Sequence, residues 1–130
     1  MNGGADVMQK TDILIVEDDT LVGEVTRAIL ANKGFSARLV PNSLAALALI
    51  KSSPPKLILA DIMLPGISGL QLCKLVTSNP DLAQVKVVIM SAKAFETEIA
   101  RARALGASAF LAKPFSKEEL LAAVTPLLKP

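Results

Sequence analysis

The sequence predicts one α/β domain, built as a doubly wound parallel sheet with helices on both faces. Three observations predict this fold class. Short β-branched apolar runs alternate with longer segments of helical periodicity, hydrophobic residues make up 52% of the chain, and 130 residues suffice for one domain rather than two. Strands that alternate with helices are parallel, and the crossovers between them are right-handed.

The strand predictions rest on five apolar segments. Those at 13–16, 57–60 and 85–90 are continuous, which is typical of parallel strands that are buried on both faces. Segments 36–40 and 108–111 are weaker candidates. A five-stranded sheet of this class normally has the flavodoxin-like order 2-1-3-4-5. In that order, ligands bind in a crevice at the carboxyl ends of the first and third strands.

Five helices are predicted from apolar residues that recur every three or four positions. They are expected to run from Leu21 to a cap at Gly34, from Asn42 to the prolines at 54–55, over about 68–78, from 94 to a stop near Gly106, and over 116–128. The last of them begins with Ser-Lys-Glu-Glu, which is a capping-box pattern.

Composition excludes several classes of site. The chain has no histidine, tryptophan or tyrosine, so it can hold neither a Ser-His-Asp triad nor an HExxH zinc site. Its single cysteine, Cys73, cannot form an internal disulfide or a cysteine zinc cluster, and it is expected in the core. The net charge of +2, spread along the chain, gives no indication of direct nucleic-acid binding.

Localisation is predicted from what the sequence lacks. No apolar run approaches the roughly 20 residues that span a bilayer. Residues 1–11 are polar and lack the apolar core of a signal peptide, so they are expected to form a disordered tail before a domain at 12–130. The sequence therefore predicts a cytoplasmic protein without membrane contact.

Polar and charged residues follow the strands that end near the predicted crevice. They are Glu17, Asp18 and Asp19 after the first strand, Asp61 after the third, Ser91 after the fourth and Lys113 after the fifth. Carboxylates that converge in one cleft repel one another, and a hard divalent cation relieves that repulsion. Oxygen ligands without histidine or cysteine favour Mg²⁺, for which Mn²⁺ can substitute, over zinc.

The same cluster has the groups that phosphoryl transfer needs. Mg²⁺ uses one or two carboxylates and shares its other positions between water and phosphate, which leaves Asp61 free to act as a nucleophile. Lys113 offers a positive charge and Ser91 a hydroxyl to the phosphoryl oxygens. Asp19 has an alternative role as the N-cap of the first helix.

Together these motifs resemble the receiver domains of bacterial two-component response regulators, over about residues 12–128. The likeness rests on Ile-Val-Glu-Asp-Asp at 15–19, Asp-Ile-Met-Leu-Pro-Gly-Ile-Ser-Gly at 61–69, Met-Ser-Ala at 90–92 and Phe-Leu-Ala-Lys-Pro-Phe at 110–115. Each motif alone is modest evidence, but all four in order, at the ends of the right strands, make a specific match.

The resemblance implies a phosphoprotein of phosphorelay signal transduction. Asp61 would accept a phosphoryl group from a sensor histidine kinase or a histidine phosphotransfer protein in a Mg²⁺-dependent reaction. The metal site would consist of Asp18 as a direct ligand, Glu17 acting through water, Asp61 itself, and the backbone carbonyl of Met63. Activity of its own would be limited to self-phosphorylation and slow autodephosphorylation.

The resemblance also implies how the signal leaves the site. Ser91 and Lys113 would contact the phosphoryl group, and Ser91 with Phe110 would form the switch. The surface made by the fourth helix, fifth strand and fifth helix would then signal to an output protein or domain, or form a phosphorylation-dependent homodimer. The family often has threonine and tyrosine where this chain has Ser91 and Phe110.

Two other functions stay open at this point. An aspartate-nucleophile phosphohydrolase would carry a second acid two residues after the nucleophile, where this chain has Met63. A phosphorylation-independent binding module with a receiver fold would be expected to lack the lysine or an acid, whereas this chain has the full set. A flavin-binding domain is disfavoured because the acids at 17–19 would repel a phosphate.

Overall fold

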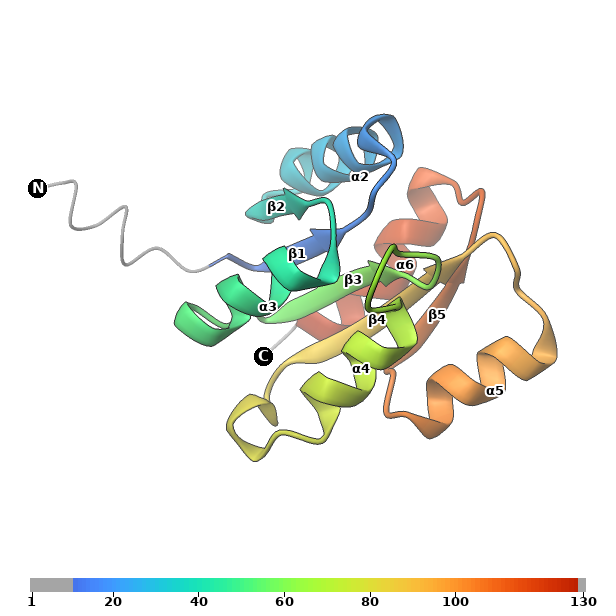
Figure 1. Cartoon of the computed structure of the whole chain (residues 1–130). Coiled ribbons are helices and arrows are strands. Elements are labelled where there is room, and N and C mark those ends of the chain that lie inside the picture. Colours follow the sequence, from blue (N-terminus) through green and yellow to red (C-terminus); the bar gives the residue numbers. More distant parts are fainter. Residues whose placement is uncertain (1–10, 129–130) are drawn as a thin grey trace, which may run out of the picture.

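The computed structural model describes residues 11–128, which form a five-stranded parallel sheet between two layers of helices (Figure 1). The strands are β1 (Ile13–Val16), β2 (Ala37–Val40), β3 (Leu57–Asp61), β4 (Lys86–Ser91) and β5 (Ala109–Ala112). Their order in the sheet is β2-β1-β3-β4-β5, and every neighbouring pair is parallel. The predicted doubly wound fold with the order 2-1-3-4-5 is confirmed.

The strands differ in burial, and the strength of their apolar sequence patterns differs in the same way. Every residue of β1 and β3 is buried, because each of these strands lies between two others and beneath helices on both faces. At the edges of the sheet, β2 buries only Val40 and β5 only Leu111. The edge strands therefore need fewer apolar residues, which explains their weaker patterns.

Helices cover both faces of the sheet. They are α2 (Thr20–Asn32), α3 (Ser43–Ser52), α4 (Gly69–Thr77), α5 (Glu96–Ala104) and α6 (Lys117–Leu128), with a short 3₁₀ helix, η1 (Pro80–Leu82), before β4. On one face, α2 and α6 contribute Leu30 and Leu120 to an apolar cluster with the strands. On the other face lie α3, α4 and α5 (Figure 1), which bury Ile50, Leu72 and Ala102 respectively.

Local hydrogen bonds and backbone angles set the ends of the helices. Asp19 accepts a hydrogen bond from a backbone amide in the first turn of α2 (3.2 Å), so its alternative role as an N-cap is confirmed. Ser116 and Glu119 form the reciprocal hydrogen bonds of the predicted capping box before α6. Gly34, with φ of 93°, follows α2 as predicted. The fourth of these α-helices, α5, begins at Glu96, two residues later than predicted, and lacks a side-chain cap.

Cys73 lies in the core, as its apolar neighbours predict. Its side chain is fully buried on the face covered by α3, α4 and α5, and burial raises the pKa of the thiol to about 11. A thiol with such a pKa stays neutral near pH 7 and is a poor nucleophile. Cys73 is therefore a structural residue.

Among the described helices, none is long and apolar enough to cross a bilayer. The tail predicted at 1–11 lies outside the described residues, apart from Thr11.

Candidate functional site

The predicted site residues lie at the carboxyl edge of the sheet. Glu17 and Asp18 follow β1, Asp61 is the last residue of β3, Ser91 is the last residue of β4, and Lys113 follows β5. Because all five strands are parallel, these ends meet at one edge. The crevice at the switch between β1 and β3 is the place where the fold class binds ligands.

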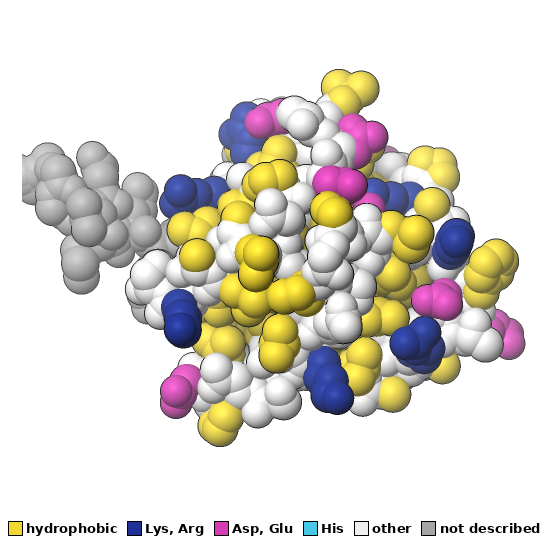
Figure 2. All heavy atoms as spheres, viewed as in Figure 1, with side chains coloured by type: hydrophobic (Ala, Val, Ile, Leu, Met, Phe, Trp, Pro, Cys, Tyr) yellow, Lys and Arg dark blue, Asp and Glu magenta, His cyan; other side chains and the backbone are white. Residues whose placement is uncertain are grey.

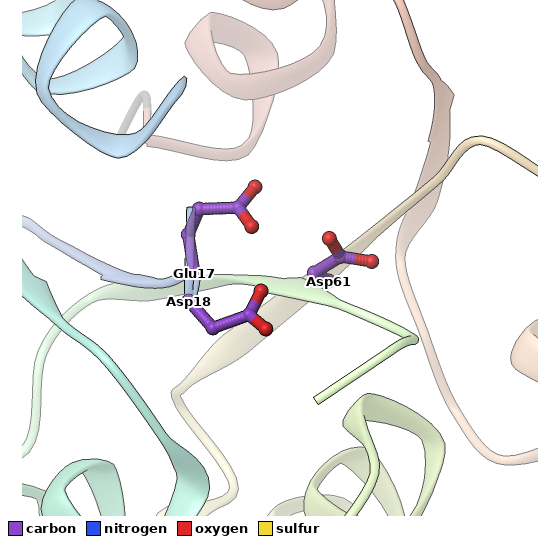
Figure 3. A group of neighbouring side chains, drawn as sticks. All are labelled: Glu17, Asp18 and Asp61. Carbon is purple, nitrogen blue, oxygen red and sulfur yellow. The ribbon is translucent and has the colours of Figure 1, made fainter. Parts of the chain in front are cut away.

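Three of these carboxylates form one cluster. One oxygen from each of Glu17, Asp18 and Asp61 lies within 4.8 Å of the others. In Figure 3, the side chains of Glu17 and Asp18 extend from the end of β1 toward the side where Asp61 lies. Glu17 and Asp61 are buried, with 2% and 7% of their surface exposed, whereas Asp18 is exposed. Negative charge is therefore concentrated at a partly buried position.

Lys113 is the cation of this cluster. Its Nζ donates hydrogen bonds to Glu17 Oε1 at 2.5 Å and to Asp61 Oδ2 at 2.6 Å. Burial alone would lower the pKa of Lys113, but the hydrogen bonds and negative charges of Asp61 and Glu17 outweigh it, so the pKa of Lys113 is raised. Lys113 therefore stays positively charged at neutral pH and links the two buried carboxylates.

The cost of burying the charge of Glu17 is less well compensated than that of Lys113. Burial raises the pKa of Glu17 above its usual value, and the hydrogen bonds from Lys113 and from the Asp19 amide offset this only in part. The negative charge of Asp61 acts in the same direction as burial. Because the carboxylates share the charge of Lys113, a further cation would lower the electrostatic free energy of the cluster. Carboxylate oxygens suit Mg²⁺ or Mn²⁺, so the residues present fit the predicted metal.

Backbone contacts fix the position of Asp61. Its Oδ1 accepts a hydrogen bond from the Met63 amide at 3.0 Å. Met63 itself is 58% exposed. Gly69, the first residue of α4, packs so closely that an added Cβ would lie 2.1 Å from the Asp61 carbonyl oxygen. Sequence reasoning gave Gly69 no role, although it is the last residue of the motif at 61–69.

Ser91 and Phe110 lie on the same face of neighbouring strands. Ser91 is fully buried, and its Oγ accepts a hydrogen bond from the Lys93 amide at 2.9 Å. In the register of β4 and β5, Phe110 lies opposite Ile89, which is two residues before Ser91 and so points to the same side of the sheet. Phe110 is half-buried and packs against the apolar cluster on the face covered by α3, α4 and α5. The structure thus places a buried hydroxyl and a partly exposed ring on one face of neighbouring strands.

Comparisons with known proteins agree on one family. Residues 13–125 match the model of a family described as response regulator receiver domain. The chain is 34% identical to the response regulator MprA of Mycobacterium sp. (strain KMS), in a match that covers 90% of this chain and 50% of that protein. It is 31% identical to the transcriptional regulatory protein CseB of Streptomyces avermitilis, covering 93% of this chain and 50% of that protein. The chain thus spans about half the length of these curated relatives.

Solved structures share the fold over nearly the same range. The signal receiver domain of a signal transduction histidine kinase from Syntrophus aciditrophicus has a TM-score of 0.82 and 30% identity, with 89% of this chain and 88% of that chain covered. A CheY-like response regulator receiver domain protein from Methanospirillum hungatei JF-1 has a TM-score of 0.84 and 27% identity, with 92% and 94% covered.

Proposed function

The chain belongs to the family of response regulator receiver domains, and on this premise we propose that it is a phosphorylation-driven switch with Asp61 as the phosphoacceptor. The observation that carries the proposal is the environment of Asp61. One carboxylate oxygen accepts a backbone hydrogen bond, the other lies 2.6 Å from Lys113 Nζ, and two further carboxylates lie beside it. Phosphoryl transfer depends on positioning and charge stabilisation, and these groups can supply both.

In the proposed reaction, a carboxylate oxygen of Asp61 attacks the phosphorus of a phosphohistidine on the donor protein. A P–O bond forms and the P–N bond breaks, with its electron pair going to the imidazole nitrogen of the donor. Lys113 keeps its charge and moves from the two carboxylates to the new phosphoryl oxygens. Ser91 donates a hydrogen bond from its hydroxyl to the same oxygens.

The metal that we propose for the site is Mg²⁺, for which Mn²⁺ can substitute. Asp18, Asp61 and the backbone carbonyl of Met63 would hold it directly, and Glu17 would act through water. When bound, it would offset the negative charge of the carboxylates and of the phosphoryl oxygens. Support comes from the acidic cluster, whose ligand oxygens lie within 4.8 Å of one another.

The partners that we propose are a sensor histidine kinase or histidine phosphotransfer protein as donor, and an output protein or domain as target, in the cytoplasm. The output surface is made by α5, β5 and α6 and is coupled to Asp61 through Ser91 and Phe110. A phosphorylation-dependent homodimer is one form that this output takes. The relatives named as regulatory proteins, about twice as long as this chain, support a role in signalling.

A phosphohydrolase is not favoured as an alternative. Such an enzyme needs a general acid two residues after the nucleophile, and Met63 stands there with an exposed, uncharged side chain. Activity beyond self-phosphorylation and slow autodephosphorylation is therefore not part of the proposal.

Intact-mass analysis after incubation with acetyl phosphate and Mg²⁺ tests the proposal. We expect one phosphoryl adduct on the wild-type chain and none on Asp61→Asn, because an amide is a poor nucleophile. Asp81→Asn, which alters an exposed aspartate in η1, serves as the matched control and should keep the adduct. An adduct of equal yield on Asp61→Asn would place the nucleophile elsewhere. A wild-type chain that never gains one would favour a phosphorylation-independent binding module.

A further inference from the structure

A second surface feature lies at the opposite edge of the sheet from Asp61. A groove with a volume of about 760 Å³ runs between α3 and α4, and it reaches η1, which precedes β4. Its apolar lining includes Leu47 and Ala48 of α3, Leu75 of α4 and Leu82 of η1. In Figure 2, hydrophobic side chains gather at the centre of the visible face, between α3 and α4.

The outer side of α3 is poor in charge and rich in apolar residues. The helix has one charged residue, Lys51, in ten, and apolar residues occur around its whole circumference. Leu44 is 70% exposed and Ala48 is also exposed, while Leu75 on the facing wall of the groove is 48% exposed. A helix that is apolar all round is normally buried on all sides, whereas α3 packs on the sheet with one side only.

Two charged residues of opposite sign line the groove. Lys51 stands on the α3 side, and Asp81 stands on the η1 side. Both are exposed, and neither forms an ion pair with another described residue. A surface with one cation and one anion on opposite sides of an apolar strip is complementary to itself, which is the requirement of a two-fold interface.

We propose that this groove, defined by Leu47, Ala48, Leu75, Lys51 and Asp81, is a homodimer interface in which a second copy of the chain covers α3. A two-fold axis along the groove places Lys51 of each protomer over Asp81 of its partner, and the apolar strips of the two protomers meet between the two ion pairs. The interface uses neither Asp61 nor the surface made by α5, β5 and α6. Its formation therefore does not depend on phosphorylation or on the function proposed above.

Sedimentation equilibrium on the full chain, without a phosphodonor, tests this interface. We expect a concentration-dependent dimer for the wild type. Lys51→Glu alone and Asp81→Lys alone should each weaken it about tenfold or more, because each reversal creates two like-charge contacts across the axis. An equimolar mixture of the two variants should recover the dimer as a heterodimer, since each variant supplies the charge that the other lacks. This recovery also shows that the variants are folded.

Charged substitutions at apolar positions distinguish this interface from nonspecific hydrophobic association. Leu75→Asp should weaken the dimer, because it puts a charge into the apolar strip. Leu21→Asp is the matched control, because Leu21 is 73% exposed on α2, which covers the other face of the sheet, and this change should leave the dimer intact. A wild type that stays monomeric at millimolar concentration would overturn the proposal. A dimer that survives both charge reversals, or single variants that stay monomeric when mixed, would also overturn it.

Discussion

At the scale of single residues, Lys113 sets the charge balance of the site. Its amino group serves two carboxylates, and the side chains of Lys113, Glu17 and Asp61 are only 16%, 1% and 9% exposed. Removing one partner of a buried ion pair costs more than the pair contributes, because the remaining charge stays desolvated. In this cluster, loss of the lysine would leave two such charges.

We therefore expect Lys113→Met to lower the free energy of unfolding by about 3 kcal/mol in the presence of EDTA. Urea denaturation measures this difference directly. Millimolar Mg²⁺ should recover part of the loss, because it supplies a replacement cation. Lys86→Met is the control, since Lys86 is exposed at the start of β4, and it should change stability by no more than about 0.5 kcal/mol. Equal losses in the two variants would contradict the stabilising role of Lys113.

Asp18 is the exposed member of the acidic cluster, and its charge should matter most for metal binding. At ten times the Kd for Mg²⁺, the wild type should gain about 1.4 kcal/mol of stability by mass action, seen as a higher Tm. Asp18→Asn should be more stable than the wild type in EDTA, because repulsion is relieved, and should respond less to Mg²⁺. Glu118→Gln, which alters an exposed acid of α6 outside the cluster, should keep the full response. An unchanged wild-type Tm in Mg²⁺ would count against the metal site.

At the scale of elements, the start of α4 positions the phosphoacceptor. Gly69 lies against the backbone of Asp61 with no room for a Cβ, and its amide donates to the Ile62 carbonyl at 3.1 Å. We expect Gly69→Ala to push α4 away from β3, to lower stability by about 1–3 kcal/mol and to slow phosphorylation of Asp61 by acetyl phosphate.

A variant at a second glycine distinguishes an effect on stability from an effect on the position of Asp61. At Gly23 in α2, the three atoms nearest to an added Cβ all belong to the Leu39 side chain, the closest at 2.6 Å, and none belongs to a site residue. Whatever its effect on stability, Gly23→Ala should be phosphorylated at the wild-type rate below the melting temperature. If both alanine variants are phosphorylated at the same rate, Gly69 has no positioning role.

The elements also show what could be predicted from sequence. The central strands β1 and β3 could be predicted because burial on both faces demands continuous apolar runs. The 3₁₀ helix η1 could not, since three residues carry no periodicity. The exact start of α5 could not be predicted, because no side chain caps it.

At the candidate site, the shared position of the residues could be predicted, but their individual contacts could not. Glu17, Asp18, Asp61, Ser91 and Lys113 could be expected at one edge of the sheet because the ends of parallel strands meet there. The contact between Lys113 and Glu17 joins residues 96 positions apart and depends on side-chain directions that no sequence pattern encodes. The close approach of Gly69 depends on how α4 packs on the end of β3, which is a tertiary property.

At the scale of the whole molecule, the site and the proposed output surface are linked through β4 and β5. Ser91 ends β4, and Phe110 lies on the neighbouring strand on the side covered by α5. A phosphoryl group on Asp61 adds up to about two negative charges. If Ser91 turns toward it, Phe110 can move inward behind the hydroxyl, and α5 must repack. Phosphorylation then acts by favouring one of two arrangements of the same surface.

Amide NMR chemical shifts, recorded with and without Mg²⁺ and beryllofluoride as a mimic of the phosphoryl group, test this switch most directly. In the wild type, we expect shifts in the loops around Asp61 and also in α5, β5 and α6. Ser91→Ala should keep the changes near Asp61 and reduce those at Phe110, whereas Asp61→Asn should show neither. Shifts confined to the loops around Asp61, with α5 and β5 unchanged, would contradict a switch that reaches the output surface.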